Sequence, residues 1–214
     1  ARSTQASKSW TPLPISPRFA KQIAMTLPPA LELQTPRLRL QALRTTDLDT
    51  VLALRTDPAA MERMLEGVQD RAAALETLRT FEGLWEARGV GMFGVFERDS
   101  GEFVGEAGLM LRPDGLGLAV RYSLLPAARG RGYAREAITE IVSFALADGR
   151  LDRVVAVLSD DNKASQALVE DLGFNLEQSF YRGRQKMLVY GLSAAFWRAR
   201  QRLADFLVQA KAGL

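Results

Sequence analysis

The segment Arg129-Gly130-Arg131-Gly132 constrains the fold most, because it separates a predicted strand from a predicted helix. The strand pattern over 116–125 ends at Pro126, and a helical pattern occupies 133–147. The first turn of a helix has free N–H groups and the positive end of the helix dipole, which together favour a phosphate. Two glycines let the chain turn sharply and let an anion approach the backbone, and two arginines complement a diphosphate. The segment therefore predicts an anion-binding loop in an α/β domain.

The remaining periodicity predicts a single α/β (α+β) domain over residues 31–214, with a central mixed sheet. Strands are predicted at 37–43, 92–97, 102–111, 116–125, 153–158, 175–182 and 186–193. Helices are predicted at 47–56, 70–88, 133–147, 163–172 and 194–211. Thr46 and Asp49 resemble a capping box for the first helix, Pro58 would stop it, and Asp70 would cap the second.

The last predicted helix carries an apolar stripe of Phe196, Trp197, Leu203, Ala204, Leu207 and Val208. Stripes of this kind usually face a core, and we expect the same here. A contact between two copies, which would make a homodimer, is the alternative.

The chain has no cysteine and no histidine. Their absence excludes thiol nucleophiles, disulfides, histidine-based triads and nearly all zinc sites. Catalysis must therefore use carboxylates, hydroxyls, basic side chains, backbone dipoles or a cofactor, and we expect no metal. No apolar run approaches the ~20 residues that a membrane span needs. We expect a cytoplasmic protein without a membrane partner.

The net charge of +3 is concentrated at the N-terminus. Residues 1–31 hold four basic residues and no acid, so the rest has 24 basic and 25 acidic residues, a net charge of −1. The body therefore shows no nucleic-acid footprint. Residues 1–30 form a basic extension that we interpret as flexible, as a targeting segment or as cloning-derived, with Met25 the natural start in the last case.

The glycine loop is part of a larger resemblance. Residues Arg129–Ala134 match the Arg/Gln-x-x-Gly-x-Gly/Ala signature of the GNAT superfamily of N-acetyltransferases, and residues 162–165 with 170–174 resemble its second cofactor motif. Thr35–Leu40, Val104–Leu109 and Val189–Leu192 are similar to its flanking strands. The resemblance covers about residues 33–194, and the motifs together resemble the branch that includes the ribosomal-protein N-terminal acetyltransferases.

The resemblance implies the GNAT fold, a mixed sheet of about six or seven strands splayed into a V by a bulge, flanked by about four helices and followed by a C-terminal helix. It implies acetyl-CoA as co-substrate, with its pantetheine arm between the strand that ends at Leu125 and the strand at 153–158. The amide of Asn162 would hold that arm, and Ser165 would lie near the sulfur. The implied cofactor-binding residues are Ser123, Leu124, Arg129, Gly130, Arg131, Gly132, Tyr133, Ala134, Asn162 and Ser165.

Two catalytic residues of the family do not carry over. A tyrosine that many relatives have is Val169 here, and a glutamate of some peptide-specific relatives is Val157. Glu106 is the leading alternative base, on a strand expected to face the substrate cleft, unless it is a solvated glutamate paired with a basic residue. Ser165 could protonate the leaving thiolate, or it could cap a helix or anchor the cofactor. A backbone N–H at the bulge could polarise the carbonyl.

The weak catalytic apparatus bears on the acceptor. A peptide α-amine has a pKa near ~8 and a lysine amine near ~10.4, so only the former is appreciably neutral at pH 7. We therefore predict direct attack in a ternary complex by a protein N-terminal α-amine or a small amine. An aminoglycoside- or polyamine-type acetyltransferase and a catalytically silent acyl-CoA-binding module are the alternatives. Arg121, where relatives often have a small residue, suggests an acceptor cleft that favours anionic groups.

Overall fold

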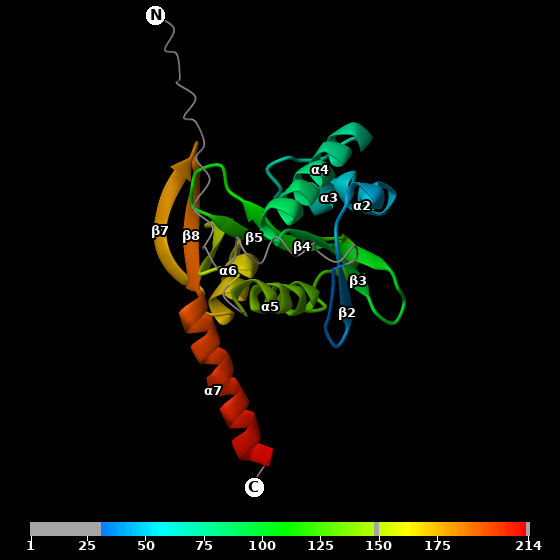
Figure 1. Cartoon of the computed structure of the whole chain (residues 1–214). Helices are drawn as coiled ribbons and strands as arrows, with labels where there is room; N and C mark the ends of the chain where they lie inside the picture. The colour runs from blue at the N-terminus through cyan, green and yellow to red at the C-terminus, as the bar shows by residue number, and fades with distance from the viewer. Residues whose placement is uncertain (1–30, 148–149, 213–214) are drawn as a thin grey trace, which may run out of the picture.

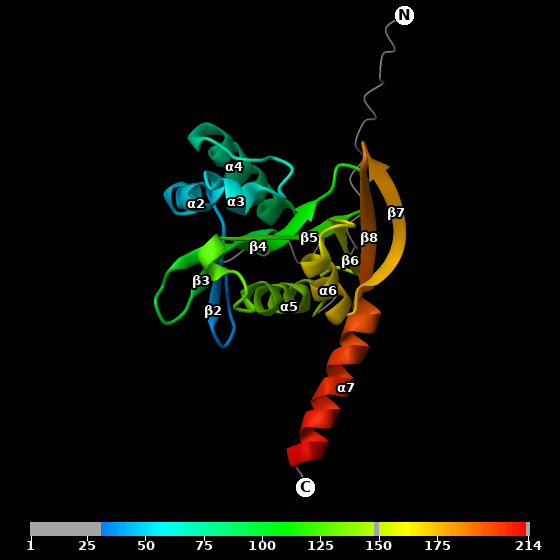
Figure 2. The same cartoon turned by 180° about the vertical axis from the view of Figure 1, so that it is seen from behind.

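The computed structural model describes residues 31–147 and 150–212, and the predicted extension over 1–30 lies outside them. One sheet forms the middle layer, with α2, α3 and α4 on one face and α5 and α6 on the other (Figures 1 and 2). The strands are β1 (Glu32–Gln34), β2 (Leu38–Ala42), β3 (Met92–Glu97), β4 (Phe103–Leu111), β5 (Leu118–Leu124), β6 (Arg153–Ser159), β7 (Asn175–Arg182) and β8 (Gln185–Ser193). The helices are α2 (Leu48–Arg55), α3 (Pro58–Met61), α4 (Arg71–Arg88), α5 (Tyr133–Leu146), α6 (Lys163–Asp171) and α7 (Ala194–Ala212).

The predicted mixed α/β fold is confirmed, with eight strands instead of six or seven. The additional strand is β1, which pairs antiparallel with β2 at the edge of the sheet. The additional helix is α3, because Pro58 begins a helix as well as ending one. Proline fits the first helical position, and Asp57 caps α3 by accepting a hydrogen bond from the Ala60 N–H.

Of the two predicted N-terminal helix caps, one is confirmed and the other is wrong. Asp70 caps α4 as expected, accepting from the Ala73 N–H at 2.8 Å, and Gly89 ends that helix in the left-handed conformation. The capping box at Thr46 and Asp49 is wrong. A 3-10 turn precedes α2 instead, and the Asp47 carboxylate accepts from the Arg44 N–H at 2.8 Å.

The sheet has the order β1-β2-β3-β4-β5-β6-β8-β7, and every neighbouring pair is antiparallel except β5 and β6. These two parallel strands share a single residue pair, Ala119 with Val155. By contrast, β4 and β5 pair without a break from Gly105–Leu124 to Leu111–Leu118. The sheet therefore consists of two arms that are joined near one end of β5 and separate toward the other.

The registers show where the sheet is irregular. The shifts lie between Val95 and Phe96, where β3 meets β4, and between Leu176 and Gln178, where β7 meets β8. The β4–β5 ladder shows no shift. The two arms therefore separate where β5 and β6 lack pairs, and no register shift lies between β4 and β5 there.

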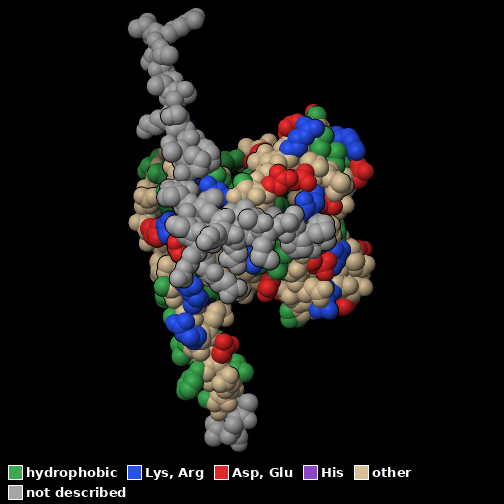
Figure 3. Space-filling model, viewed as in Figure 1, with side chains coloured by type: hydrophobic (Ala, Val, Ile, Leu, Met, Phe, Trp, Pro, Cys, Tyr) green, Lys and Arg blue, Asp and Glu red, His purple; other side chains and the backbone are tan. Residues whose placement is uncertain are grey.

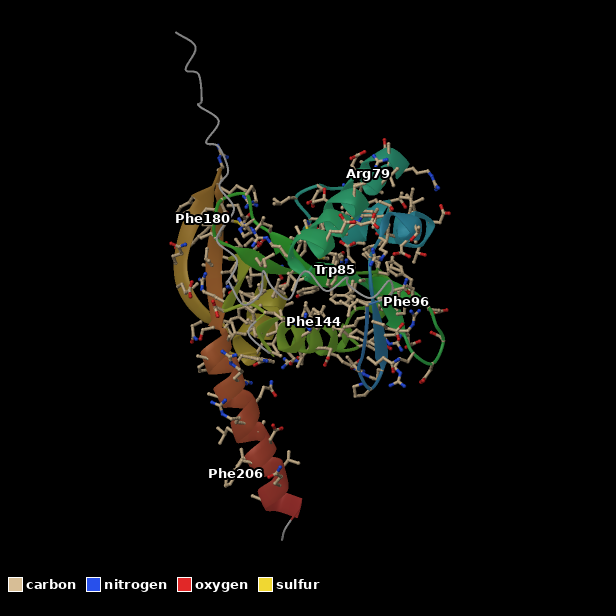
Figure 4. All side chains as sticks on the ribbon, viewed as in Figure 1. Arg79, Trp85, Phe96, Phe144, Phe180 and Phe206 are labelled. Atoms are coloured by element: carbon tan, nitrogen blue, oxygen red, sulfur yellow. The ribbon has the colours of Figure 1, made fainter. Side chains whose placement is uncertain are left out.

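Two apolar clusters hold the layers together. One joins α5 to the sheet through Ile138, Ile141 and Val142 and includes Trp85 of α4, while the other fixes α2 and α4 around Phe81. Figure 4 shows Trp85 and Phe144 near the middle of the molecule, and their rings lie 6.4 Å apart. Burying each large apolar side chain contributes about 1.5–3 kcal/mol, so these clusters fix the position of α5 and of the loop before it.

The C-terminal helix departs from its prediction. Ala194 and Trp197 are buried, but Phe196, Leu203, Leu207 and Val208 are 47%, 59%, 51% and 68% exposed. The helix leaves the body after its first turn, as Figures 1 and 2 show. The expected core-facing stripe is therefore wrong for all but its first turn. No helix within residues 31–147 and 150–212 is long and apolar enough to cross a membrane.

Candidate active site

The glycine loop joins the end of β5 to the start of α5, beside the opening between the two arms. Gly130 has φ +73° and Gly132 has φ +79°, a backbone region that favours glycine. Gly132 is the N-cap residue of α5, and no side chain of the described residues caps this helix. The N–H groups of Tyr133 and Ala134 in the first turn therefore remain available to an anion. A Cβ atom added to Gly130 would meet nothing within 4 Å, so this side of the loop is open.

The two loop arginines are held by protein groups. Arg129 donates from Nε to the Leu124 carbonyl at 3.1 Å and from Nη2 to the Ala59 carbonyl at 2.7 Å, which fastens the loop to β5 and α3. Arg131 pairs with Glu97 at 2.5 Å and lies over the Tyr133 ring. Arg129 thus serves the loop conformation, although both arginines are exposed.

A second set of contacts, which the sequence did not predict, supports the loop from the edge of the sheet. Glu136, one turn into α5, accepts from Thr35 Oγ1 at 2.5 Å and from the Arg37 N–H at 2.8 Å. Arg37 also donates to the Arg131 carbonyl at 2.9 Å. Partial burial opposes ionisation of Glu136, but these hydrogen bonds outweigh it and hold its pKa below the ordinary value. The signal in the sequence is Thr35-Pro36-Arg37, which by itself indicates only the start of a strand.

A surface hollow of about 440 Å³ borders the loop. It is lined by the β1–β2 turn and by the first two turns of α5, including Arg37, Gly132 and Glu136. No residue of β5 or β6 lines this hollow. It therefore lies on the outer side of the loop and is separate from the opening between the arms.

The start of α6 faces β5 across that opening. Asn162 caps α6 by accepting from the Ser165 N–H at 3.2 Å through Oδ1, which leaves its amide Nδ2 without a partner among the described residues. Ser165 is buried, and its Oγ lies 2.7 Å from the Tyr122 hydroxyl of β5. Burial raises the pKa of the Tyr122 phenol, against the opposing effect of the Ser165 hydrogen bond. The phenol therefore stays protonated at neutral pH.

Glu106 occupies an environment that the sequence did not predict. Its side chain is fully buried, and both carboxylate oxygens accept from Nη2 of Arg55, at 2.7 and 2.5 Å. Arg55 is 1% exposed and contacts Gln69 and the Phe81 ring. The carboxylate is not half-desolvated at a cleft, as a base would be. The alternative is right about the pairing with a basic residue and wrong about the solvation, because the pair is buried.

Arg121, next to Tyr122 on β5, does not present a free positive charge. It forms a two-point ion pair with Glu66 in the loop after α3, at 2.7 and 2.6 Å. Burial opposes ionisation of Glu66, but Arg121 outweighs it and lowers the pKa of that carboxyl. The expectation that Arg121 makes the cleft favour anions is therefore corrected, because Glu66 neutralises it.

The remaining residues singled out from the sequence offer their backbone to the opening or have side chains that pack in the core. The Ser123 hydroxyl donates to the Ala60 carbonyl at 2.7 Å, so its side chain belongs to the α3 contact. The Leu125 N–H bonds to Val104 of β4, and strand alternation therefore turns the backbone of Leu124 toward the opening. Val169 is buried, as is Tyr190, whose hydroxyl donates to Glu170. Burial and this carboxylate raise the pKa of Tyr190 to about 12.

A mixed sheet that opens beside an uncapped, glycine-led helix is the framework of an acetyltransferase. Residues 37–175 match the acetyltransferase (GNAT) domain model. This match covers more than half of the chain, and the chain therefore belongs to the GNAT acetyltransferase family.

Individual relatives agree. The uncharacterized N-acetyltransferase YoaA of Bacillus subtilis is 30% identical over 148 residues, covering 68% of this chain and 83% of YoaA. A Bordetella pertussis structure described as a GnaT-family acetyltransferase has a TM-score of 0.68 and 26% identity, covering 76% of this chain and 99% of its own. RimL, a ribosomal-protein α-N-acetyltransferase solved with coenzyme A, has a TM-score of 0.67 and 18% identity, covering 76% and 98%. The protein is thus an acetyl-CoA-dependent acetyltransferase.

Proposed function

We propose that the pyrophosphate of acetyl-CoA binds the free N–H groups at the start of α5. The observation that carries this proposal is the open, uncapped helix start behind two glycines of positive φ. The pantetheine arm would follow β5 past the backbone of Leu124, where β6 supplies no pairing partner. The amide Nδ2 of Asn162, which has no partner within residues 31–147 and 150–212, would donate to that arm from the opposite side of the opening.

The acceptor that this site suits best is a protein N-terminal α-amine or a small amine with a similarly low pKa. At pH 7 roughly a tenth of an α-amine is neutral, against well under a thousandth of a lysine amine, a difference worth about 3 kcal/mol. Glu106 is buried beneath an arginine, so the site offers no exposed carboxylate there to remove a proton. The likeness in fold to RimL is consistent with an α-amine acceptor.

Polycationic acceptors fit less well. A polyamine or aminoglycoside needs unpaired acids in the cleft, whereas three acids around this opening are paired with arginines. Glu66 is bound by Arg121, Glu106 by Arg55 and Asp161 by Arg63.

In the proposed reaction the neutral amine attacks the thioester carbonyl, the carbon–sulfur bond breaks, and coenzyme A leaves as a thiolate. Ser165 would donate its proton to the sulfur and recover one from Tyr122, with which it shares a hydrogen bond. The attacking amine loses its proton to water, and water returns a proton to Tyr122, so that no net proton is left on the enzyme. Glu106 then acts as a positioning residue that holds β4 against α2, and not as the base predicted from the sequence.

Thiol release across an amine panel tests the acceptor. We expect turnover with a peptide whose only amine is its N-terminus, and little with the same peptide N-acetylated and carrying one lysine, with spermidine or with an aminoglycoside. Preferred turnover of spermidine or the aminoglycoside would overturn the α-amine assignment. Acetyl-CoA binding without turnover on any amine would favour a silent acyl-CoA-binding module.

The loop is tested by a matched pair of glycines. Gly130 and Gly101 both have φ +73°, and both have open space where a Cβ atom would lie. Gly130→Val and Gly101→Val therefore impose the same backbone strain, but only the former places a side chain at the proposed pyrophosphate site. We expect coenzyme A affinity to fall by about tenfold or more, roughly 1.4 kcal/mol, for Gly130→Val alone. Equal affinities in calorimetry would refute the placement.

A further inference from the structure

Helix α7 stands apart from the body along most of its length. After Trp197, no side chain from Arg198 to Ala210 is buried, and Gln201 alone among them is half-buried. Figure 4 shows Phe206 near the free end of this helix, away from the sheet. An isolated helix of about 12–15 residues is only marginally stable in water, so a helix of this kind gains stability from something that covers it.

The free part of α7 has one apolar face. At 100° per residue, Phe196 of the first turn and Leu203, Phe206 and Leu207 of the free part fall within an arc of roughly 100°. These side chains are 47%, 59%, 66% and 51% exposed. Monomeric proteins rarely expose a continuous apolar stripe of this kind without using it as a contact surface.

The polar part of α7 is basic. Arg198, Arg200 and Arg202 are exposed, and Asp205 is the one acid in the helix. On the helical wheel Arg200 borders one side of the apolar face and Arg202 borders the other. Figure 3 shows the basic side chains near the start of α7 and apolar side chains farther along it. Both borders of the apolar face thus carry positive charge.

A second copy of this helix does not satisfy that pattern. Two such helices side by side would bring arginines to the seam without acids to pair with them. The free part is roughly 20 Å long and about 10 Å wide, so a helix pair buries on the order of 400 Å². Specific interfaces bury about 1,200 Å² or more. The partner therefore has to be negatively charged and has to accept phenylalanine and leucine side chains.

We propose that α7 is an interfacial helix that docks the enzyme on an anionic lipid surface. Its phenylalanine and leucine face would enter the headgroup boundary. Arg200 donates to the Asp171 carbonyl at 2.6 Å. Arg202 and Arg198 would therefore contact the lipid phosphates. Low net hydrophobicity, a basic polar face and an opposite Phe/Leu face are typical of helices that lie in the plane of a membrane. The sequence argument against a membrane partner considered only spanning segments, and a helix that lies on the surface needs no apolar run of ~20 residues.

Co-sedimentation of the full chain with vesicles tests the proposal. We expect binding to phosphatidylcholine vesicles that contain phosphatidylglycerol, weakening as salt is added, and no binding to pure phosphatidylcholine. Phe206→Gln should weaken binding at least about tenfold. Val208→Gln is the matched control, because Val208 is as exposed as Phe206, at 68% against 66%, but lies off the apolar face.

Charge is tested separately with Arg198→Gln combined with Arg202→Gln, which should abolish the preference for anionic vesicles, while Arg79→Gln on α4 should not. All these side chains are exposed, so circular dichroism should show unchanged folding. Three results would overturn the proposal: no binding to anionic vesicles, equal binding to neutral ones, or a dimer in sedimentation that Phe206→Gln dissolves. Acetyl transfer is measured on the same variants and is expected to be unchanged, so the lipid surface and the proposed acceptor can fail independently.

Discussion

One guanidinium nitrogen of Arg55, Nη2, lies 2.7 and 2.5 Å from the two carboxylate oxygens of Glu106, in a contact without solvent exposure on the Glu106 side. Arg55 closes α2, and Glu106 lies in the middle of β4 between Gly94 and Ser123. The pair therefore ties a helix of the outer layer to the strand beside β5. Removing one charge would leave the other buried without a partner, which is costly in a protein interior.

Glu106→Gln should lower the free energy of unfolding by about 3 kcal/mol, because Arg55 keeps its buried charge. Urea unfolding measures this, and replacing both residues with apolar ones of similar size should restore much of the loss. Per folded molecule, the rate should keep its pH profile. A shifted profile at unchanged stability would instead establish Glu106 as the base predicted from the sequence.

Ser165→Ala should reduce kcat by on the order of 100-fold, because the departing thiolate loses its proton donor. Tyr122→Phe should cause a smaller loss and should flatten the alkaline limb of the kcat profile, since burial raises the pKa of that phenol. Steady-state kinetics at several pH values measures both. Tyr190→Phe is the control, because it also removes a hydrogen-bonded phenol hydroxyl but lies at Glu170. If all three variants lost activity equally, packing and not proton transfer would be the cause.

Asn162 can be tested for two roles at once. Asn162→Asp keeps an oxygen that caps α6 but removes the amide donor, whereas Asn162→Ala removes both. We expect Asn162→Asp to retain stability within about 0.5 kcal/mol and to lose coenzyme A affinity, while Asn162→Ala loses affinity and about 1 kcal/mol of stability. Thermal unfolding and calorimetry separate the two effects. Wild-type affinity in Asn162→Asp would reduce the role of this residue to capping.

The lowered pKa of Glu136 predicts that the free energy of unfolding falls in acid. Its folded-state pKa lies below the ordinary value of 4.5, so the unfolded chain binds the proton more readily. Its stabilising effect is complete above the unfolded pKa and is lost as the pH falls through the folded one. Urea midpoints from pH 7 to pH 3 should therefore fall less steeply for Glu136→Gln than for the wild type. Parallel curves would show that Thr35 and Arg37 do not favour the ionised form of Glu136.

Local features of the fold are predictable because their causes are local. The predicted boundaries of β7 match the structure to the residue, and Asp70 and Gly89 mark the two ends of α4. The conformation of the glycine loop is equally predictable, since it depends on two nearby glycines with positive φ. In each case the residues that decide the structure lie within a few positions of one another.

The errors arise where the partner is distant in sequence or where a pattern has two outcomes. Arg55 and Glu106 are 51 residues apart, and no periodicity relates them. Glu66 reaches Arg121 over a comparable separation, which turns an apparent anion site into a neutral pair. The stripe on α7 is apolar as predicted, but an apolar pattern alone does not determine whether the stripe packs on the core or faces another surface.

Among the described residues, Ala119 and Val155 form the one residue pair between β5 and β6, so the backbones of the two arms separate beyond it. Coenzyme A bound along β5 would contact both arms of the sheet and bridge the space between them. The two arms would then become more rigid when the co-substrate binds and lose that rigidity when coenzyme A leaves, once in every turnover. The active site would therefore be most rigid while the acetyl group is being transferred.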